Sequence, residues 1–249
     1  HCAGVLHCSY PGASHSRFEH SIGVSYLAGS LMDRFRRSQP KLDIDDNMCD
    51  LVRLAGLAHD IGHGPFSHVF DGEVIPLLRP DLKPGEYSHE MMGLRMLELL
   101  IDENGIELEN PKEDLRTIKE LIMASDDGIP QHARQQDRAW MYEIVANGTN
   151  SVDVDKFDYI ARDSRATGVP PAFDHRRLMT FSRVIDGSIC YHAKEAMNLY
   201  SLFNTRYCLF KQVYTHRAGK AIEYMVRDVL VEADRAWGGR LARYVKLFC

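Results

Sequence analysis

The chain has 249 residues, of which 45% are hydrophobic and 26% charged, and its 30 basic and 35 acidic side chains leave a net charge of -5. These are the proportions of a soluble globular protein, large enough to bury a sizeable core without disulfides or zinc. No apolar run approaches the roughly 20 residues that cross a bilayer, which argues against a membrane protein. The six cysteines are scattered, so we expect a reducing, intracellular compartment, nuclear or cytoplasmic.

Helical spacing of apolar residues dominates the start of the chain. It predicts a helix over residues 16–37, with His20 near its beginning. The expected buried stripe of this helix consists of Phe18, Ile22, Gly29, Met32 and Phe35.

A second predicted helix begins at a cap provided by Asp45 or Asp46. The glycine- and proline-rich segment 62–65 ends it. His59 and the following Asp60 therefore fall in or directly after its last turn.

Three more segments follow before the middle of the chain. Ser88 is a suitable N-cap for a helix through Leu100, and Asn110 and Pro111 open another helix, where the missing N–H of proline costs nothing. Residues 125–138 are polar and aperiodic, so we expect a loop.

The segment 153–167 is predicted to be a helix with one polar stripe. Asp155, Tyr159 and Asp163 are spaced four residues apart, which places them on one face. Residues 184–191 form two short apolar runs about an Asp-Gly turn and predict a β-hairpin, and helical patterns resume over 194–237. The chain is therefore predicted to be mainly α, with one short β-hairpin, and to form one domain over residues 1–249.

Histidine is the outlier in composition. Six of the twelve histidines lie between residues 15 and 89, where His59 adjoins Asp60. Imidazole and carboxylate together suit Mn²⁺, Fe²⁺, Zn²⁺ or Ni²⁺. A His-Asp pair alone is common by chance, and a metal needs further ligands; His20 and Asp155, on two other predicted helices, are the natural candidates.

Three segments in chain order carry a resemblance to a known family: residues 14–24 (SHSRFEHSIGV), 55–68 (AGLAHDIGHGPFSH) and 152–163 (VDVDKFDYIARD). They resemble the HD phosphohydrolase superfamily and, within it, the deoxynucleoside triphosphate triphosphohydrolases. They are most similar to the animal enzymes that join a SAM domain to an HD domain. The likeness runs from about Pro11 to Asp234. The SAM domain and the parts of the family core before His1 and after Cys249 are absent, so we expect a piece of a longer protein.

The resemblance implies an HD-domain helical core that hydrolyses deoxynucleoside triphosphates to deoxynucleoside and inorganic triphosphate. It implies one transition metal (Fe, Mn or Zn) and a Mg²⁺ ion on the substrate phosphates. The implied metal ligands are His20, His59, Asp60 and Asp155.

The resemblance also implies the other site residues. Catalytic positions fall on His63, His68, Asp71 and His89. His68, charged with the help of Asp71, is the implied general acid for the departing 5′-oxygen. Substrate contacts fall on Arg17, Lys156, Tyr159, Asp163, Arg206 and Tyr214. Arg17 and Lys156 would contact phosphate, and Asp163 would accept a hydrogen bond from the 3′-hydroxyl. Effector-binding positions fall on Arg177, Lys194 and Arg217.

The chain departs from the family pattern at several pocket positions. A glutamine-leucine pair that packs on sugar and base becomes Cys2 and Ala3, a histidine becomes Phe210, and a glutamine becomes Thr215. These changes predict weaker exclusion of ribonucleotides. His15 is interpreted as a surface or hydrogen-bonded residue at a helix entry.

Two other functions stay open at this point. One is a nucleotide or single-stranded nucleic-acid binding protein whose turnover is lost or altered, and the other is an HD phosphohydrolase that acts on another nucleotide. The expected partners are deoxynucleoside triphosphates, a nucleotide effector, further copies of the chain and single-stranded nucleic acid, with no membrane.

Overall fold

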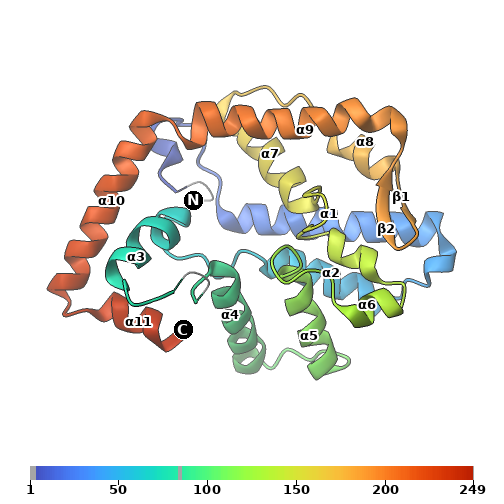
Figure 1. The fold of residues 1–249 in the computed structure, drawn as a ribbon, viewed down its shortest axis with the longest axis horizontal. Helices are drawn as coiled ribbons and strands as arrows, with labels where there is room; N and C mark the ends of the chain where they lie inside the picture. Colours follow the sequence, from blue (N-terminus) through green and yellow to red (C-terminus); the bar gives the residue numbers. More distant parts are fainter. Residues whose placement is uncertain (1–3, 84–85, 249) are drawn as a thin grey trace.

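The computed structural model describes residues 4–83 and 86–248, which are mainly helical (Figure 1). The α-helices are α1 (Arg17–Ser38), α2 (Asp46–Ala58), α3 (Ile75–Leu78), α4 (His89–Asn104), α5 (Pro111–Ile122), α6 (Gln131–Gln135), α7 (Val154–Thr167), α8 (His175–Thr180), α9 (Ala196–Leu209), α10 (Arg217–Ala236) and α11 (Arg240–Phe248). Short 3-10 turns lie at Leu6–Cys8, Pro40–Leu42, Ala139–Glu143 and Ala193–Glu195, and π turns lie at Phe70–Val74 and Phe210–Tyr214. Strands β1 (Ser182–Ile185) and β2 (Ser188–Tyr191) form the antiparallel hairpin, with Ile185 opposite Ser188.

Side-chain caps explain where the main helices begin. Ser16 accepts a hydrogen bond from the Glu19 backbone N–H, and the Glu19 side chain accepts from the Ser16 backbone N–H, which makes a capping box for α1. Asp45 caps α2, Ser88 caps α4 and Asp153 caps α7 in the same way. The predicted helix starts are confirmed to within about a residue.

The large core lies where α1 packs along α2 and against α7. Phe35 of α1 is fully buried and meets the ring of Trp140 edge-on, with ring centroids 5.6 Å apart. Phe157 and Ile160 carry the apolar side of α7 into the same core. A second, small cluster lies around Phe70. Figure 1 shows α3, α10 and α11 together at that end of the molecule.

The predicted stripe of α1 is right in its second half and wrong at its start. Met32 and Phe35 are buried, but Phe18 is 71% exposed and Ile22 is 47% exposed. The buried residue there is His20, which is 2% exposed. A position two residues away on a helix lies on the opposite side, so burying His20 turns Phe18 and Ile22 outward.

One other prediction needs correction. The segment 125–138 is not all loop, because one turn of helix, α6, lies within it. The helical patterns over 194–237 form two helices, and a π turn and the His216 cap separate α9 from α10. Figure 1 shows these helices as two rods meeting at an angle.

Candidate metal centre and active site

Three helices bring the first four candidate residues together. His20 lies in the first turns of α1, and Asp155 lies in the first turn of α7. His59 is the C-cap of α2, and Asp60 follows it. The contacts of α1 with both α2 and α7 therefore place the four side chains at one point of the core.

The donor atoms of these four residues converge. His20 Nε2 lies 3.1 Å from Asp155 Oδ1 and 3.5 Å from Asp60 Oδ2. His59 Nε2 lies 3.5 Å from each of the same two oxygen atoms. The two imidazole nitrogens and the Asp155 oxygen could hold one divalent cation, and the Asp60 oxygen lies beside them as a fourth candidate ligand.

Neighbouring groups fix how both imidazoles point. His20 Nδ1 donates to Asp158 Oδ2 at 2.7 Å, and His59 Nδ1 donates to the Gly56 carbonyl at 2.8 Å. Each neutral ring then presents the lone pair of Nε2 to the centre, as metal-binding histidines do. His59 Nε2 is buried and has no hydrogen-bond partner among the described residues. This donor set fits a bound transition metal.

The electrostatics of the centre favour a cation. Burial lowers the pKa of His20, but hydrogen bonds with Asp155 and Asp158 outweigh it and raise that pKa to about 10. Burial raises the pKa of Asp155, and the contacts with His20 and His59 outweigh burial and hold it well below its usual value. A divalent cation would take the place of the protons that these carboxylates stabilise on the neighbouring imidazoles.

A second group of histidines lies beside the first. His63 and His89 stack with ring centroids 3.7 Å apart, and His68 meets His63 edge-on at 4.8 Å. Asp71 accepts from His63 Nδ1 at 2.8 Å and lies 3.4 Å from His89 Nδ1. His63 Nε2 lies 3.4 Å from Asp60 Oδ1, which connects the two groups.

The pairing expected between Asp71 and His68 is wrong. Asp71 contacts His63 and His89 instead. Burial, followed by the charges of His63, His89 and Arg17, lowers the pKa of His68 to about 4. Burial also lowers the pKa of His89, but Asp71 and Glu90 outweigh it and raise the pKa to about 9. These shifts favour His89 over His68 as the imidazole that holds a proton.

The two candidate phosphate contacts flank the metal ligands. The Arg17 guanidinium pairs with Asp60 Oδ2 and donates to Ser67 Oγ at 2.7 Å. Lys156 Nζ donates to Asp153 Oδ2 at 2.8 Å. Arg17 therefore lies against Asp60, a candidate metal ligand. Lys156 lies against Asp153, which caps α7, the helix that carries Asp155.

The polar stripe predicted on α7 leads away from the centre into a second set of contacts. Arg206 Nε donates to the Tyr159 hydroxyl at 3.0 Å, and the Tyr214 hydroxyl donates to Asp163 Oδ2 at 2.6 Å. The substrate residues inferred from α7 and α9 are thus brought together.

The altered pocket positions also contribute contacts here. The Arg206 guanidinium lies 4.8 Å above the Phe210 ring, and Thr215 Oγ1 donates to the Phe210 carbonyl at 2.7 Å. Cys2 and Ala3 lie outside the described residues.

Sequence reasoning missed two residues of the site. Asp158 orients His20, and its position three residues after Asp155 is a signal that could have revealed it. The side chain of His15 is only 9% exposed, and its Nε2 lies 2.7 Å from Asp163 Oδ1. No pattern near His15 indicates that contact, because the two residues lie 148 positions apart.

The three effector positions do not meet within one chain. Arg177 of α8 pairs with Glu195, next to Lys194. Arg217 begins α10, and Figure 1 places α8 and the start of α10 at opposite ends of α9.

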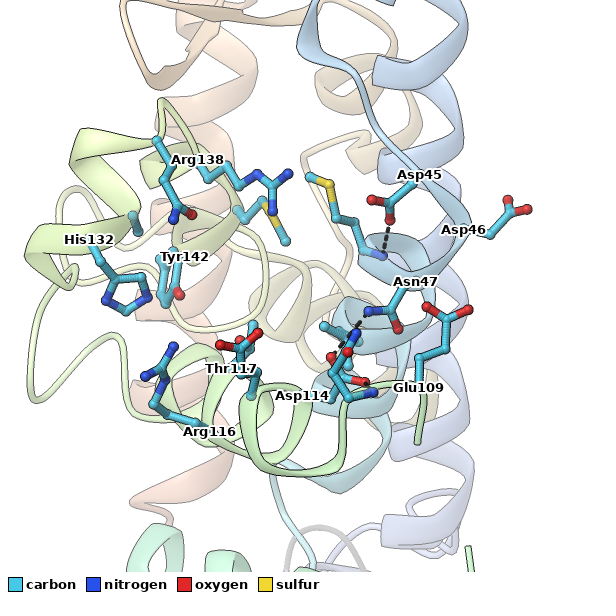
Figure 2. A pocket seen from close by; sticks show the side chains of 17 residues that line it. Asp45, Asp46, Asn47, Glu109, Asp114, Arg116, Thr117, His132, Arg138 and Tyr142 are labelled. Carbon is cyan, nitrogen blue, oxygen red and sulfur yellow. Dashed lines mark hydrogen bonds between the residues drawn. The ribbon is translucent and has the colours of Figure 1, made fainter. Parts of the chain in front are cut away.

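Two cavities adjoin the pair formed by α2 and α5. The smaller one, about 130 Å³, is lined by His59, Asp60, His89, Asp155 and Lys156 among others. The larger one, about 510 Å³, lies at the other end of both helices (Figure 2), where Asp45, Asn47, Glu109, Asp114, His132 and Tyr142 are among its lining residues. The larger cavity holds none of the candidate metal ligands, so size does not mark the candidate active site.

The chain is similar to known proteins over the segment that contains this candidate site. A profile of the HD domain family matches residues 17–163, a span that begins at Arg17 and ends at Asp163. The chain belongs to the HD domain family. It is 49% identical over 232 residues to the deoxynucleoside triphosphate triphosphohydrolase SAMHD1 homolog of Dictyostelium discoideum, covering 93% of this chain and 43% of that protein.

Two further relatives are similar to this chain over nearly its whole length. The chain is 44% identical over 241 residues to the deoxynucleoside triphosphate triphosphohydrolase SAMHD1 of Homo sapiens, covering 90% of this chain and 38% of that protein. It is 32% identical over 247 residues to a putative HD domain-containing protein of Acanthamoeba polyphaga mimivirus, covering 93% and 50%. The chain therefore spans half or less of the length of these relatives. None of the helices in the described part combines the length and apolar content needed to cross a membrane.

Proposed function

We propose that this chain is the core of a metal-dependent enzyme that hydrolyses deoxynucleoside triphosphates to deoxynucleoside and inorganic triphosphate. The observation that carries the proposal is the convergence of His20 Nε2, His59 Nε2 and the oxygen atoms of Asp60 and Asp155 beside cationic side chains. The relatives are deoxynucleoside triphosphate triphosphohydrolases, and their activity supplies the substrate class.

In this proposal His20, His59, Asp60 and Asp155 hold one Fe, Mn or Zn ion. Such an ion would supply an activated water at neutral pH and would polarise a phosphoryl oxygen. Mg²⁺ on the phosphate chain is a second part of the proposal.

The cationic side chains would bind and orient the triphosphate. Arg17 and Lys156 exchange their present carboxylate partners for phosphate oxygens, which accept the same hydrogen bonds. His63 lies between the two groups of histidines and would contact phosphate. Tyr159, Arg206 and Tyr214 would line the nucleoside side.

The departing 5′-oxygen needs a proton, and His68 and His89 are the candidate donors. His89 holds its proton through Asp71 and Glu90. His68 lies beside His63 and His89, with ring centroids 5.9 Å from His89. We propose that these two imidazoles act together, with His89 as the charged partner.

The test is product identification. Purified protein is incubated with each deoxynucleoside triphosphate in the presence of Mn²⁺ and Mg²⁺, and the products are separated by ion-exchange chromatography. We expect deoxynucleoside and intact triphosphate in equal amounts, with no product from His59→Gln. His132→Gln, which changes a histidine of α6 that lines the larger cavity, is the matched control and should retain full activity.

Other outcomes would select another function. Release of pyrophosphate or single phosphates would indicate a different reaction at the same centre. Tight nucleotide binding without any product would favour a binding protein with lost turnover.

A further inference from the structure

The feature that this function leaves unexplained is the turn that carries His68, residues 64–71. Phe66 and Ser67 are consecutive, and their φ angles of 64° and 54° lie in the left-handed region. Residues with a Cβ atom rarely adopt this conformation, because the Cβ approaches the backbone too closely. Such strain persists only where the surrounding structure enforces it, and it is concentrated at functional sites.

Backbone hydrogen bonds and packing enforce this turn. The Ser67 N–H donates to the Gly64 carbonyl at 2.9 Å, and the Ser67 carbonyl accepts from the Phe70 N–H at 2.9 Å. Phe70 is buried, and a Cβ atom on Gly64 would lie 2.2 Å from its ring, so the ring lies directly against the turn. The turn therefore holds Ser67 in one orientation.

The strained turn aims the Ser67 hydroxyl at Arg17. Ser67 is 4% exposed, and its Oγ accepts a hydrogen bond from Arg17 Nη2 at 2.7 Å. The other terminal nitrogen, Arg17 Nη1, pairs with Asp60 Oδ2, the oxygen that lies 3.5 Å from His20 Nε2. The guanidinium thus extends from the turn to the candidate metal centre.

A neutral partner of this kind suits an arginine that binds phosphate. Fixing a long side chain in one conformation costs conformational entropy, and this cost weakens binding unless the side chain is already ordered in the free protein. A hydroxyl oxygen accepts from the guanidinium without cancelling its positive charge, whereas a second carboxylate would cancel it. The serine therefore orients Arg17 and leaves its charge available to a phosphate.

We propose that Ser67 is a positioning residue for phosphate binding. Its hydroxyl holds Nη2 of Arg17, and this directs Nη1 to a phosphate oxygen of the substrate beside the metal ligands. The inference rests on the proposed function, and it gives the left-handed turn a role. Ser67 acts on the substrate through Arg17 and does not touch it.

The experiment measures the binding of inorganic triphosphate by calorimetry in the presence of Mn²⁺. This probe carries the phosphate chain alone, and as the proposed product it is not consumed. The proteins are the unchanged chain, Ser67→Ala, Arg17→Ala and the double variant. Ser182→Ala is the matched control, because Ser182 begins β1, is also buried, and its hydroxyl donates to the Met179 carbonyl at 2.8 Å.

We expect Ser67→Ala to weaken triphosphate binding about 10-fold, because Arg17 loses the hydrogen bond that orients it. Arg17→Ala should weaken binding about 100-fold. The double variant should bind as Arg17→Ala does, since a serine that acts through Arg17 has no effect once the arginine is removed. Ser182→Ala should leave the affinity unchanged.

A glycine at the same position separates the hydroxyl from the strained backbone. Ser67→Gly also removes Oγ, but glycine adopts positive φ without strain, so this variant should melt at a higher temperature than Ser67→Ala. Its affinity for triphosphate should nevertheless fall about 10-fold. Thermal melting of every variant reports whether the fold is retained.

Unchanged triphosphate affinity in either Ser67 variant would overturn the inference. Additive losses in the double variant would overturn it too, because Ser67 would then act independently of Arg17. Failure of the unchanged protein to bind triphosphate would have the same consequence. Turnover is read separately: triphosphate binding that depends on both residues, without hydrolysis of deoxynucleoside triphosphates, would reject the proposed function and leave the role of Ser67 in place.

Discussion

At the scale of single residues, the centre depends on side chains that do not touch the reacting atoms. Asp158 orients His20 and is itself held by Arg162, whose guanidinium donates to both of its oxygen atoms at 2.8 Å. Gly23 makes room for this contact, because a Cβ atom there would lie 2.0 Å from Asp158 Oδ1. The geometry of one imidazole is thus set by three residues from two helices.

The first prediction concerns the metal ligand Asp155. Asp155→Ala should lower bound transition metal and the melting temperature together, because metal that binds only the folded state adds to stability. Metal at 100 times its Kd contributes about 2.7 kcal/mol, which corresponds to roughly 5–10 °C in a chain of this size. Elemental analysis and thermal melting check it. Adding a chelator should lower the melting temperature of the unchanged protein and leave that of the variant alone, and full metal content in the variant would reject the ligand set.

The second prediction separates chemistry from binding in the histidine group. His68→Ala and His89→Ala should each lower kcat by about 10²–10⁴-fold, the range for positioned acid catalysis, with little change in nucleotide affinity. Steady-state kinetics and calorimetry measure the two effects. A parallel loss of affinity and turnover in either variant would make that histidine a binding residue.

The third prediction is a pH dependence of stability. The pKa of His89 is raised to about 9 from about 6.5, so its ion pairs stabilise the fold fully below pH 6.5 and lose that contribution as pH rises through 9. Urea unfolding should therefore show a free energy that falls by about 1–3 kcal/mol across this interval. In the His89→Gln variant, this decrease in the free energy of unfolding with rising pH should disappear. An unchanged slope would show that other groups cause it.

At the scale of elements, the sequence predicted helix starts better than helix interruptions. Ser16, Asp45, Ser88 and Asp153 are caps whose side chains bond locally, so their effect can be read from a few residues. The π turn at Phe210–Tyr214 makes contacts with residues distant in sequence, because the Tyr10 hydroxyl donates to the Gln212 carbonyl and the Tyr214 hydroxyl donates to Asp163. Local periodicity continues through the turn and therefore does not indicate where one helix ends and the next begins.

The fourth prediction tests how the turn after α2 fits against α4. A Cβ atom on Gly62 would lie 2.0 Å from the His89 carbonyl oxygen and 2.2 Å from the Gly93 backbone nitrogen. Gly62→Ala must therefore push this turn away from α4, which separates the metal ligands from His89. We expect a loss of stability of about 1–3 kcal/mol, typical of overpacking, together with reduced turnover. Gly72→Ala, where a Cβ meets nothing within 4 Å, is the control.

At the scale of the whole molecule, the sequence indicated which four candidate metal ligands would converge, but not all of their surroundings. His20, His59, Asp60 and Asp155 lie in three short motifs, each readable by itself. The partner of Asp71 was mistaken because proximity in sequence favoured His68, whereas the fold brings His63 and His89 to it. The contact of His15 was not predicted for the same reason, because its partner Asp163 lies on a helix that is distant in sequence.

The fifth prediction concerns the choice between sugars, which the whole pocket determines. Phe210 is 41% exposed, and the Thr215 hydroxyl is already bonded to the backbone, so neither forms a tight wall. One missing packing contact is worth about 10–200-fold in discrimination. We expect ribonucleotides to be hydrolysed measurably, and Thr215→Gln to reduce this. Competition kinetics with paired nucleotides check it; near-complete rejection of ribonucleotides by the unchanged protein would contradict it.

The larger cavity and the metal centre lie at opposite ends of the same two helices. α2 and α5 both begin beside that cavity, and their other ends reach His59 and Ile122 at the smaller cavity. The 13 residues of α2 span about 20 Å, so Asp45 at the larger cavity lies far from His59 at the smaller one. A change at the Asp45 end would therefore act on His59 through the packing of α2 against α1 and α5, and not by direct contact.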